Sequence, residues 1–362
     1  MYFIDRLCIL SILMAVQPYL NIAVMSTQYL CQGKVVRKSR KLKRRNFMNY
    51  IIFDLEWNQS PLGKEQEEKM LPFEIVEIGA VKLNKNKEEI SRFHETIKPV
   101  VYHAFHKKTK EIIHLDMAGL RYARTFPEVI DSFLRWCGHS PKYCTWGPGD
   151  LLELQRNMRY HQIPDKLPKP LFFYDIQKIF SIVYEDRKTR RSLEFAVDAL
   201  KIPKVMEFHN ALSDAHYTAE VLKTMESNQI LKNSSIDYFR PPKLRKEEIY
   251  KVYDTYSKFV SKEFSSKTEA MDDKKVTLTK CYICGRAAKK KIHWFSNGGR
   301  NYFCLAYCES HGWLRGKVRM KKVENGGFFC VKTLKLVSPQ DAQAVQDKRI
   351  ALRLKNQIRR HN

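Results

Sequence analysis

The feature that most constrains this chain is an apolar run ending in two acids, NYIIFDLEWN at residues 49–58. β-Branched and aromatic residues without an interrupting proline or glycine predict a strand. Asp54 and Glu56 lie two residues apart, so both carboxylates are expected on one face of that strand. Paired carboxylates repel unless a cation lies between them, and such oxygen ligands suit Mg²⁺ or Mn²⁺. From these residues alone, two solvated acids at a strand end are an equally good interpretation.

The composition indicates an intracellular protein of two or three domains that meets a polyanion. The 362 residues include 65 Lys and Arg against 39 Asp and Glu, a formal net charge of +26. Such a balance is typical of proteins that bind nucleic acid or an anionic membrane surface, although charge can also serve solubility alone. The 9 cysteines are odd in number in a large chain, which argues against a disulfide framework. We therefore expect a reducing, cytoplasmic location.

Residues 1–47 form an N-terminal extension that we do not expect to be native. The apolar run at residues 7–16 is too short to span a bilayer and lacks the basic start of a signal peptide. A basic run at residues 37–45 follows, and Met48 stands directly before the predicted strand. We expect Met48 to be the native start and expect no stable membrane association. The alternative is a short membrane anchor with its basic flank in the cytoplasm.

The order of predicted elements favours an α/β domain at residues 48–228. Further strands are expected at residues 75–83, 89–98 and 143–146, with Thr125 as the cap of a helix. Helices are expected at residues 107–116, 127–137, 151–161, 172–184, 192–201 and 211–225. Strands followed by helices and one more strand indicate a mixed sheet flanked by helices.

The remaining residues predict a second, basic region. Residues 229–275 are expected to be a helical linker, because a charged segment at 246–262 follows two prolines. The cysteine-rich residues 276–337 form a small module, and Ser338-Pro339 starts a basic C-terminal helix at 338–362.

Three further residues complete a possible catalytic group with Asp54 and Glu56. Asp150 follows a predicted strand and starts a helix, a usual place for functional side chains in α/β folds. His209 precedes another helix, and Asp214 lies in its first turns. Each has an ordinary structural interpretation when taken alone, as a helix cap, a loop histidine or an acid beside a helix dipole.

Taken together and in this order, these residues resemble the DEDDh branch of the DnaQ-like, RNase T-like 3′–5′ exonucleases. The motifs are Asp54-Leu-Glu56, the aspartate of TWGPGD at 145–150, and His209-x₄-Asp214, with EIGAV at 77–81 as supporting context. The resemblance covers about residues 49–226. It implies a ribonuclease-H-like fold and hydrolysis of single-stranded RNA or DNA from the 3′ end with two Mg²⁺ or Mn²⁺ ions. The alternative is a nucleic-acid-binding protein without catalysis on the same fold.

The resemblance also assigns roles to the five residues. Asp54 is expected to bridge both ions, Glu56 and Asp214 to bind one, and Asp150 to act on the other, directly or through water. His209 is expected to accept the proton of the attacking water. Many family members have threonine after the glutamate, where this chain has Trp57. Trp57 either stacks on a substrate base or fills the core, which leaves the sugar preference open.

The cysteine-rich module carries a second metal-binding pattern. Cys281-x₂-Cys284 and Cys308-x₂-His311 are each followed by glycine, which predicts one structural Zn²⁺ in a zinc-ribbon-like domain. Cys304 is an alternative to His311. Basic residues interleaved with aromatic ones predict contact with single-stranded nucleic acid, although the rings could instead form this module's core. The basic residues are Arg286, Lys289, Lys290, Lys291 and Arg300, and the aromatic ones are Trp294, Phe295, Tyr302 and Phe303.

Overall fold

The computed structural model describes residues 48–113, 115–296, 299–324 and 326–361. Residues 1–47 lie outside these ranges. Both predictions made for them, a non-native extension or a membrane anchor, therefore concern residues that the structure does not describe. Within the described ranges, every helix is too short or too polar to cross a bilayer.

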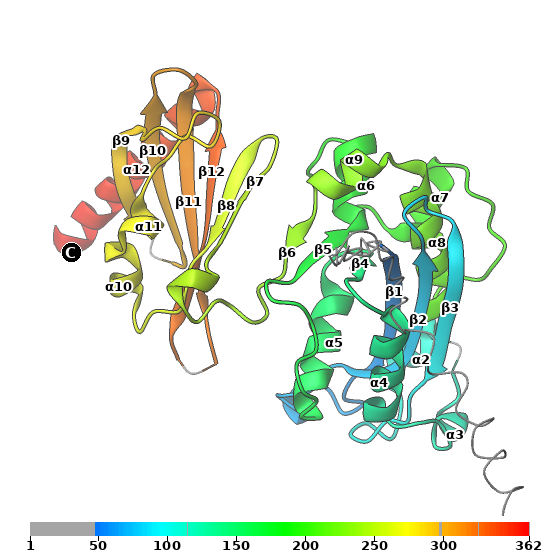
Figure 1. The fold of residues 1–362 in the computed structure, drawn as a ribbon. Helices are drawn as coiled ribbons and strands as arrows, with labels where there is room; N and C mark the ends of the chain where they lie inside the picture. The colour runs from blue at the N-terminus through cyan, green and yellow to red at the C-terminus, as the bar shows by residue number, and fades with distance from the viewer. Residues whose placement is uncertain (1–47, 114, 297–298, 325, 362) are drawn as a thin grey trace, which may run out of the picture. The chain divides into compact units, whose positions relative to one another are not determined.

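The first sheet has six strands in the order β3-β2-β1-β4-β5-β6 (Figure 1). β1 is antiparallel to β2 and parallel to β4, and β4 is parallel to β5. This arrangement confirms the predicted mixed sheet and the ribonuclease-H-like fold. The strands are β1 (Tyr50–Asn58), β2 (Glu74–Leu83), β3 (Glu89–Thr96), β4 (Lys142–Thr145), β5 (Phe172–Asp175) and β6 (Ser235–Ile236).

Helices cover both faces of this sheet, as predicted. On one face lie α4 (Phe126–Cys137) and α5 (Gly149–Tyr160), and α4 begins at a capping box of Thr125 and Glu128. On the other lie α6 (Ile176–Tyr184), α7 (Leu193–Ala199), α8 (Ala211–Thr224) and α9 (Ser227–Lys232). The shorter helices are α2 (Lys107–Ile112), α3 (Met117–Leu120) and the 3₁₀ turn η1 (Lys64–Gln66).

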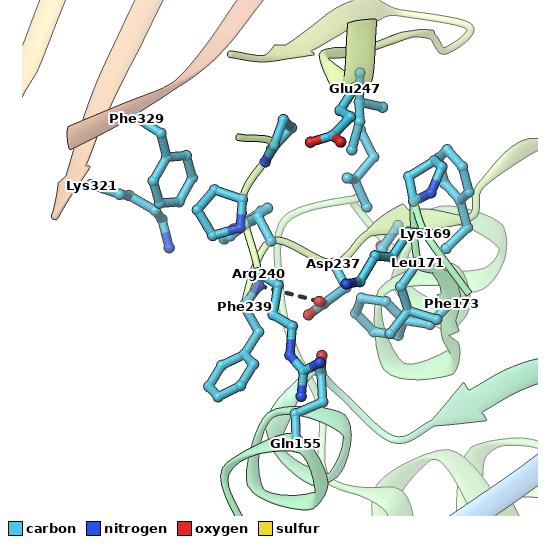
Figure 2. A pocket seen from close by; sticks show the side chains of 18 of the residues that line it. Gln155, Lys169, Leu171, Phe173, Asp237, Phe239, Arg240, Glu247, Lys321 and Phe329 are labelled. Carbon is cyan, nitrogen blue, oxygen red and sulfur yellow. Dashed lines mark hydrogen bonds between the residues drawn. The ribbon is translucent and has the colours of Figure 1, made fainter. Parts of the chain in front are cut away.

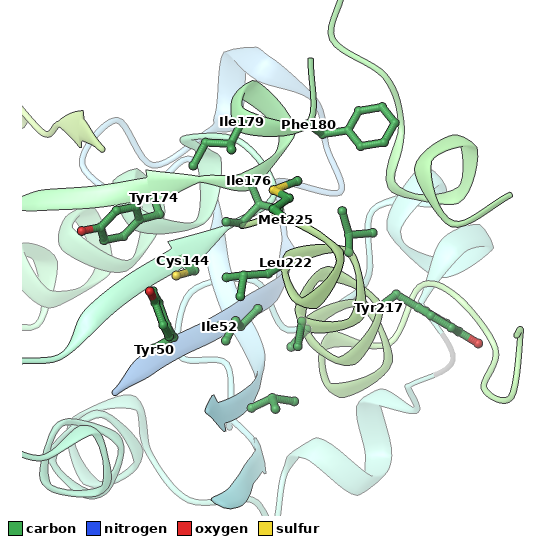
Figure 3. Close-up of a cluster of buried hydrophobic side chains, with 14 of the residues drawn as sticks. Tyr50, Ile52, Cys144, Tyr174, Ile176, Ile179, Phe180, Tyr217, Leu222 and Met225 are labelled. Atoms are coloured by element: carbon green, nitrogen blue, oxygen red, sulfur yellow. The ribbon is translucent and has the colours of Figure 1, made fainter. Parts of the chain in front are cut away.

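The central strand β1 decides which face the acids occupy. Tyr50 and Ile52 pack with α6 and α8, as Figure 3 shows, whereas Ile51 and Phe53 pack against α4 and α5. Because side chains alternate along a strand, Asp54 continues the row of Tyr50 and Ile52. Asp54 and Glu56 therefore project on the α8 side of the sheet.

The expected helix at residues 172–184 is wrong in its first turn. Residues Phe172–Asp175 form β5, and only Ile176–Tyr184 are helical. Asp175 ends the strand and caps α6, because its carboxylate accepts a hydrogen bond from the Lys178 N–H at 2.9 Å. Four residues directly before a helix are too few to show the alternating pattern of a strand. Pairing with β4 is what makes these residues a strand.

Beyond β6 the chain turns at Asp237, which anchors the loop at both ends. Its N–H donates to the Leu171 carbonyl at 2.9 Å, and its carboxylate accepts from the Phe239 N–H at 3.2 Å (Figure 2).

The second sheet is entirely antiparallel, in the order β7-β8-β12-β11-β10-β9. One face packs against α10 (Lys267–Asp272) and α11 (Lys274–Thr277), and the other carries α12 (Pro339–His361). The strands are β7 (Ile249–Val252), β8 (Tyr256–Val260), β9 (Lys289–Ser296), β10 (Asn301–Cys308), β11 (Gly312–Lys322) and β12 (Phe328–Leu336).

The predicted helical linker is therefore wrong over residues 249–260, which form the hairpin of β7 and β8. The segment is rich in tyrosine, valine and isoleucine, which suit a pleated surface. The second sheet thus begins well before the cysteines, and it is larger than the zinc-ribbon-like module that the sequence predicts.

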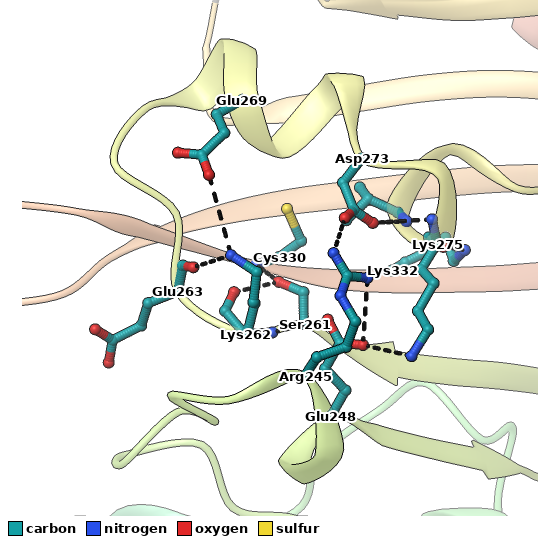
Figure 4. Close-up of polar contacts among 11 residues, drawn as sticks. Arg245, Glu248, Ser261, Lys262, Glu263, Glu269, Asp273, Lys275, Cys330 and Lys332 are labelled. Carbon is teal, nitrogen blue, oxygen red and sulfur yellow. Dashed lines mark hydrogen bonds and ion pairs between the residues drawn. The ribbon is translucent and has the colours of Figure 1, made fainter.

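Polar contacts tie the segment before β7 to this sheet (Figure 4). Arg245, in the 3₁₀ turn η2 (Arg245–Glu247), pairs with Asp273 at 2.5 Å, and Lys275 pairs with Glu248 at 2.9 Å. The buried Lys332 amine donates to the Leu278 carbonyl at 2.9 Å, and desolvation lowers its pKa to about 8.

Candidate active site

Three of the predicted acids meet at one point of the first sheet. Ligand oxygens of Asp54, Glu56 and Asp214 all lie within 4.8 Å of one another. Asp54 and Glu56 come from β1, and Asp214 comes from the first turn of α8. Residues about 160 positions apart in the chain are therefore brought together by the packing of α8 on β1 and β2.

Gly79 makes this packing possible. It lies opposite Asp54 in the β1–β2 register. A Cβ at Gly79 would be 2.1 Å from the Ala211 carbonyl carbon and 2.1 Å from the Leu212 nitrogen, both in the α8 backbone. A glycine inside a strand often marks such a close backbone approach. The first turn of α8 can thus lie directly on β2.

A hydrogen-bond chain holds the start of α8 to the same strand. Asn210 caps the helix, accepting from the Leu212 and Ser213 N–H groups at 3.1 and 3.2 Å. Its amide donates to Glu77 Oε1 at 2.9 Å, and His94 Nε2 lies 2.5 Å from the same oxygen. Glu77 lies opposite Glu56 in the register and is fully buried.

Glu77 and Asn210 are positioning residues that the sequence analysis did not single out. Asparagine before a helix is a frequent N-cap, so Asn210 carried a usable signal. Glu77 belongs to the supporting EIGAV segment, but its own role could not be predicted because its partner is 133 residues away.

Asp150 lies next to these three acids, but it does not belong to the group whose ligand oxygens lie within 4.8 Å of one another. It is buried in the first turn of α5, and its carboxylate accepts a hydrogen bond from the N–H of Leu55, between the two acids of β1. Its charge acts directly on Asp54. All four predicted acids therefore interact with one another.

Burial and crowding raise the pKa of each of the four acids in the metal-free protein. Desolvation, followed by the charges of Asp150 and Asp214, raises the pKa of Asp54 well above its usual range. Burial raises the pKa of Glu56 to about 8, that of Asp150 to about 7 and that of Asp214 to about 6, with neighbouring carboxylates adding to the Glu56 and Asp150 shifts. Clustered acids with such shifts are typical of functional sites.

The donor set fits a divalent cation. Asp214 Oδ1 is buried and has no hydrogen-bond partner among the described residues. A buried carboxylate oxygen without a partner is costly, and a hard cation would remove both that cost and the mutual repulsion of the acids.

His209 lies at the exposed edge of the site, one residue before the cap of α8. The charge of its imidazole and a hydrogen bond from its backbone N–H both lower the pKa of Asp214, against the larger effect of burial. His209 has a φ of +66°, in the left-handed region where a non-glycine residue is uncommon. The imidazole is thus close to the metal-binding acids and open to solvent.

Trp57 is half-buried and packs on protein groups. Its ring centroid lies 5.8 Å from that of Phe73, and it packs at the edge of the core formed with α4 and α5. The core interpretation therefore holds for most of this side chain.

The second predicted metal site also assembles. Ligand atoms of Cys281, Cys284, Cys308 and His311 lie within 4.8 Å of one another. Three pairs are 3.6 to 3.7 Å apart, namely Cys281 Sγ to His311 Nδ1, Cys284 Sγ to Cys308 Sγ, and Cys308 Sγ to His311 Nδ1. Tetrahedral zinc, with bonds of about 2.0–2.3 Å, requires ligand atoms about 3.5–3.8 Å apart.

Local backbone geometry and hydrogen bonds favour metal binding by these four residues. Gly285 and Gly312 follow the two knuckles with φ of +71° and +85°. Hydrogen bonds from Arg286 lower the pKa of the Cys284 thiol to about 6. Cys304 lies outside the group, buried against Gly316, and desolvation raises the pKa of its thiol to about 12. This geometry favours His311 over Cys304 as the fourth ligand.

The aromatic residues around this module are mostly core. Trp294 and Tyr302 pack with α10 and α11, and Phe295 packs under α12. Only Phe303, of the four predicted ring contacts, lies beside free cations, with Lys348 Nζ 4.0 Å from its ring centre.

The part of the chain that forms the first sheet matches a known protein family in sequence. Residues 51–222 match the model of the RNase_T family, described as exonuclease. No curated protein matches the chain in sequence.

Several solved structures resemble part of the chain. The nuclease domain of 3′hExo, a DEDDh family member bound to rAMP, is 17% identical, with a TM-score of 0.45 over 53% of this chain and 98% of its own. Pop2p of S. pombe, bound to Mg²⁺ and Mn²⁺, is 18% identical, with a TM-score of 0.38 over 48% and 81%. E. coli exonuclease I with an oligonucleotide is 15% identical, with a TM-score of 0.37 over 51% and 42%.

Proposed function

We propose that this chain, whose residues 51–222 are an exonuclease domain of the RNase T family, hydrolyses single-stranded RNA or DNA from the 3′ end with two divalent ions. The observation that carries the proposal is the meeting of three carboxylates at one point, with Asp150 beside them. A binding protein without catalysis gains nothing from buried acids that repel phosphate, so that alternative is not favoured.

The position of each residue suggests its role in the proposed hydrolysis. Asp54, Glu56 and Asp214 would hold one Mg²⁺ or Mn²⁺, and Asp54 with Asp150 would hold the second. When bound, such ions stabilise the attacking and departing oxygens of the scissile phosphate. His209, exposed at the edge of the group, accepts the proton of the attacking water. Glu77 and Asn210 keep Asp214 in place by fixing the first turn of α8.

The four ligands on the second sheet support one structural Zn²⁺. Closed four-coordinate sites of this kind leave no position for substrate, and they stabilise small folds directly. The proposed zinc site therefore serves stability of the second sheet and not the hydrolysis.

Digestion of end-labelled single strands tests the reaction class. Labelled RNA and DNA of equal length are incubated at constant salt with Mg²⁺, Mn²⁺ or EDTA, with the Asp54→Asn variant as control. We expect mononucleotides released from the 3′ end only with metal and only by the native sequence. Release from the 5′ end, or cleavage that persists in EDTA, would overturn the proposal.

A further inference from the structure

The second sheet has an unusual charge distribution. None of its six strands contains aspartate or glutamate. β11 instead carries a basic residue at every second position, namely Arg315, Lys317, Arg319 and Lys321. Since residues i and i+2 of a strand share a face, these four side chains project from one face of the sheet.

Strand register adds two cations from neighbouring strands to this row. Lys335 of β12 lies opposite Arg315. Lys258 of β8 lies opposite Thr333, which lies opposite Lys317 on its other side. We call these six residues, Arg315, Lys317, Arg319, Lys321, Lys335 and Lys258, the β11 basic face.

Helices leave much of this face open. The apolar residues on the other side of β11, such as Val318 and Met320, pack with α10 and α11. α12 covers the part of this face at Leu305 and Trp313, and its Lys348 lies over Phe303. Lys317, Arg319 and Lys335 remain exposed.

Most charges of this face are not neutralised within the protein, although the Asp237 carboxylate partly offsets the effect of burial on the Lys321 pKa. Among the residues that the structure describes, none of the six forms an ion pair with a carboxylate. Burial, with the charges of Arg319, Arg315 and Lys348, lowers the pKa of Lys317. Like charges directly opposite on neighbouring strands, such as Arg315 and Lys335, are destabilising. A polyanion that bound here would relieve that repulsion.

Aromatic rings are interleaved with these cations. Phe303 lies opposite Lys317, with the Lys317 and Lys348 amines 5.9 and 4.0 Å from its ring centre. Tyr256 lies opposite Lys335. Alternate positions of a strand are about 6.6 Å apart, and an extended single strand can follow such a row while its bases reach the rings.

We infer that the β11 basic face binds single-stranded nucleic acid, RNA or DNA, as a surface separate from the carboxylate site. The sequence pointed instead to the basic residues near the zinc ligands. Those residues lie on β9, shortly before it, or directly before β10, and three of the four rings expected beside them pack in cores. The β11 basic face has the denser row of cations and a ring beside it.

The test compares two triple variants that remove equal charge. The face variant is Lys317→Gln/Arg319→Gln/Lys335→Gln, and the control, Lys280→Gln/Lys289→Gln/Lys291→Gln, changes exposed lysines near the zinc ligands. Both are made in the full chain with Asp54→Asn, so binding is measured without cleavage and does not depend on the catalytic proposal. Affinity for fluorescent 20-nucleotide RNA and DNA is measured by anisotropy at several salt concentrations.

We expect the face variant to lose about tenfold or more in affinity and the control less than about twofold. Loss of three phosphate contacts should lower the slope of log affinity against log salt by about 2, because each contact contributes about 0.7 on single strands. An unchanged thermal melting curve for both variants excludes unfolding.

Three outcomes would overturn the inference. The first is equal loss in both variants, which would indicate general charge attraction. The second is loss in the control alone, which would place binding near the zinc ligands. The third is a face variant that binds both nucleic acids normally but no longer binds vesicles containing phosphatidylserine, which would assign the face to membranes.

Discussion

Among single residues, Asp54 is the most constrained, because every other acid of the site acts on its pKa. Replacing it by asparagine removes a metal ligand and also removes repulsion. We expect Asp54→Asn to lower the hydrolysis rate by at least about a thousandfold, as is usual when a catalytic metal ligand is lost. Its metal-free melting temperature should stay equal or rise. Single-turnover rates and thermal melts check both expectations.

The matched control for that variant is Asp254→Asn, which changes an exposed acid in the turn between β7 and β8. It should keep native activity. Near-native activity of Asp54→Asn would contradict the assigned role, and so would a variant that is inactive because it is unfolded.

The raised carboxyl pKa values give stability a definite dependence on pH. A carboxyl whose pKa is raised by folding favours the folded state at low pH, and that contribution is lost as pH rises through the folded value. With unfolded carboxyl pKa values of about 4, the folded pKa values of about 6, 7 and 8 for Asp214, Asp150 and Glu56 place the loss between about pH 4 and pH 8. We therefore expect the metal-free protein to lose stability across this range.

Metal ions should reverse that loss, since cation and protons compete for the same oxygens. Mn²⁺ is expected to raise the melting temperature more at pH 8 than at pH 6, measured with zinc kept bound. The double variant Asp54→Asn/Asp214→Asn serves as control and should show a flatter pH profile. An equal Mn²⁺ shift at both pH values would count against the site.

At the scale of elements, the position of α8 on β2 determines whether Asp214 reaches the acids of β1. We expect Gly79→Ala to push the first turn of α8 away, because the added Cβ would overlap its backbone at 2.1 Å. Overpacking of this kind costs about 1–3 kcal/mol. Activity should fall more steeply than stability, since the ligands separate. Denaturant unfolding and rate measurements on the same samples give the two numbers.

Gly119→Ala is the matched control, because a Cβ there meets no atom within 4 Å and the residue lies in α3. It should leave both quantities unchanged or raise stability slightly. If Gly79→Ala retains full activity, the tight contact of α8 with β2 is not what positions Asp214.

Elements with a clear period were predictable, and elements defined by partners were not. The acids at β1 and the cap at Thr125 follow from local sequence. β5 and the hairpin of β7 and β8 are short, and only pairing with β4 and β12 makes them strands. The candidate metal ligands could likewise be named from the sequence. The roles of Glu77 and Gly79 could not, because they come from contacts with α8.

At the scale of the whole molecule, two candidate metal-binding groups belong to two different sheets and their flanking segments, and we expect loss of one group to leave the other intact. We expect one zinc per chain in the purified protein, and the Cys284→Ser variant to lose it together with stability. Cys304→Ala, which changes a thiol outside the group, should keep the zinc. Elemental analysis and thermal melts provide the comparison, and zinc retained by Cys284→Ser would exclude the proposed ligand set.

The central claim that the four acids form one binding site for divalent ions is tested most directly by Mn²⁺ titration followed by electron paramagnetic resonance. We predict that the zinc-loaded native protein binds two Mn²⁺ ions with magnetic coupling between them, and that Asp54→Asn removes the coupled signal. Equal Mn²⁺ binding and equal spectra in the two proteins would contradict the account.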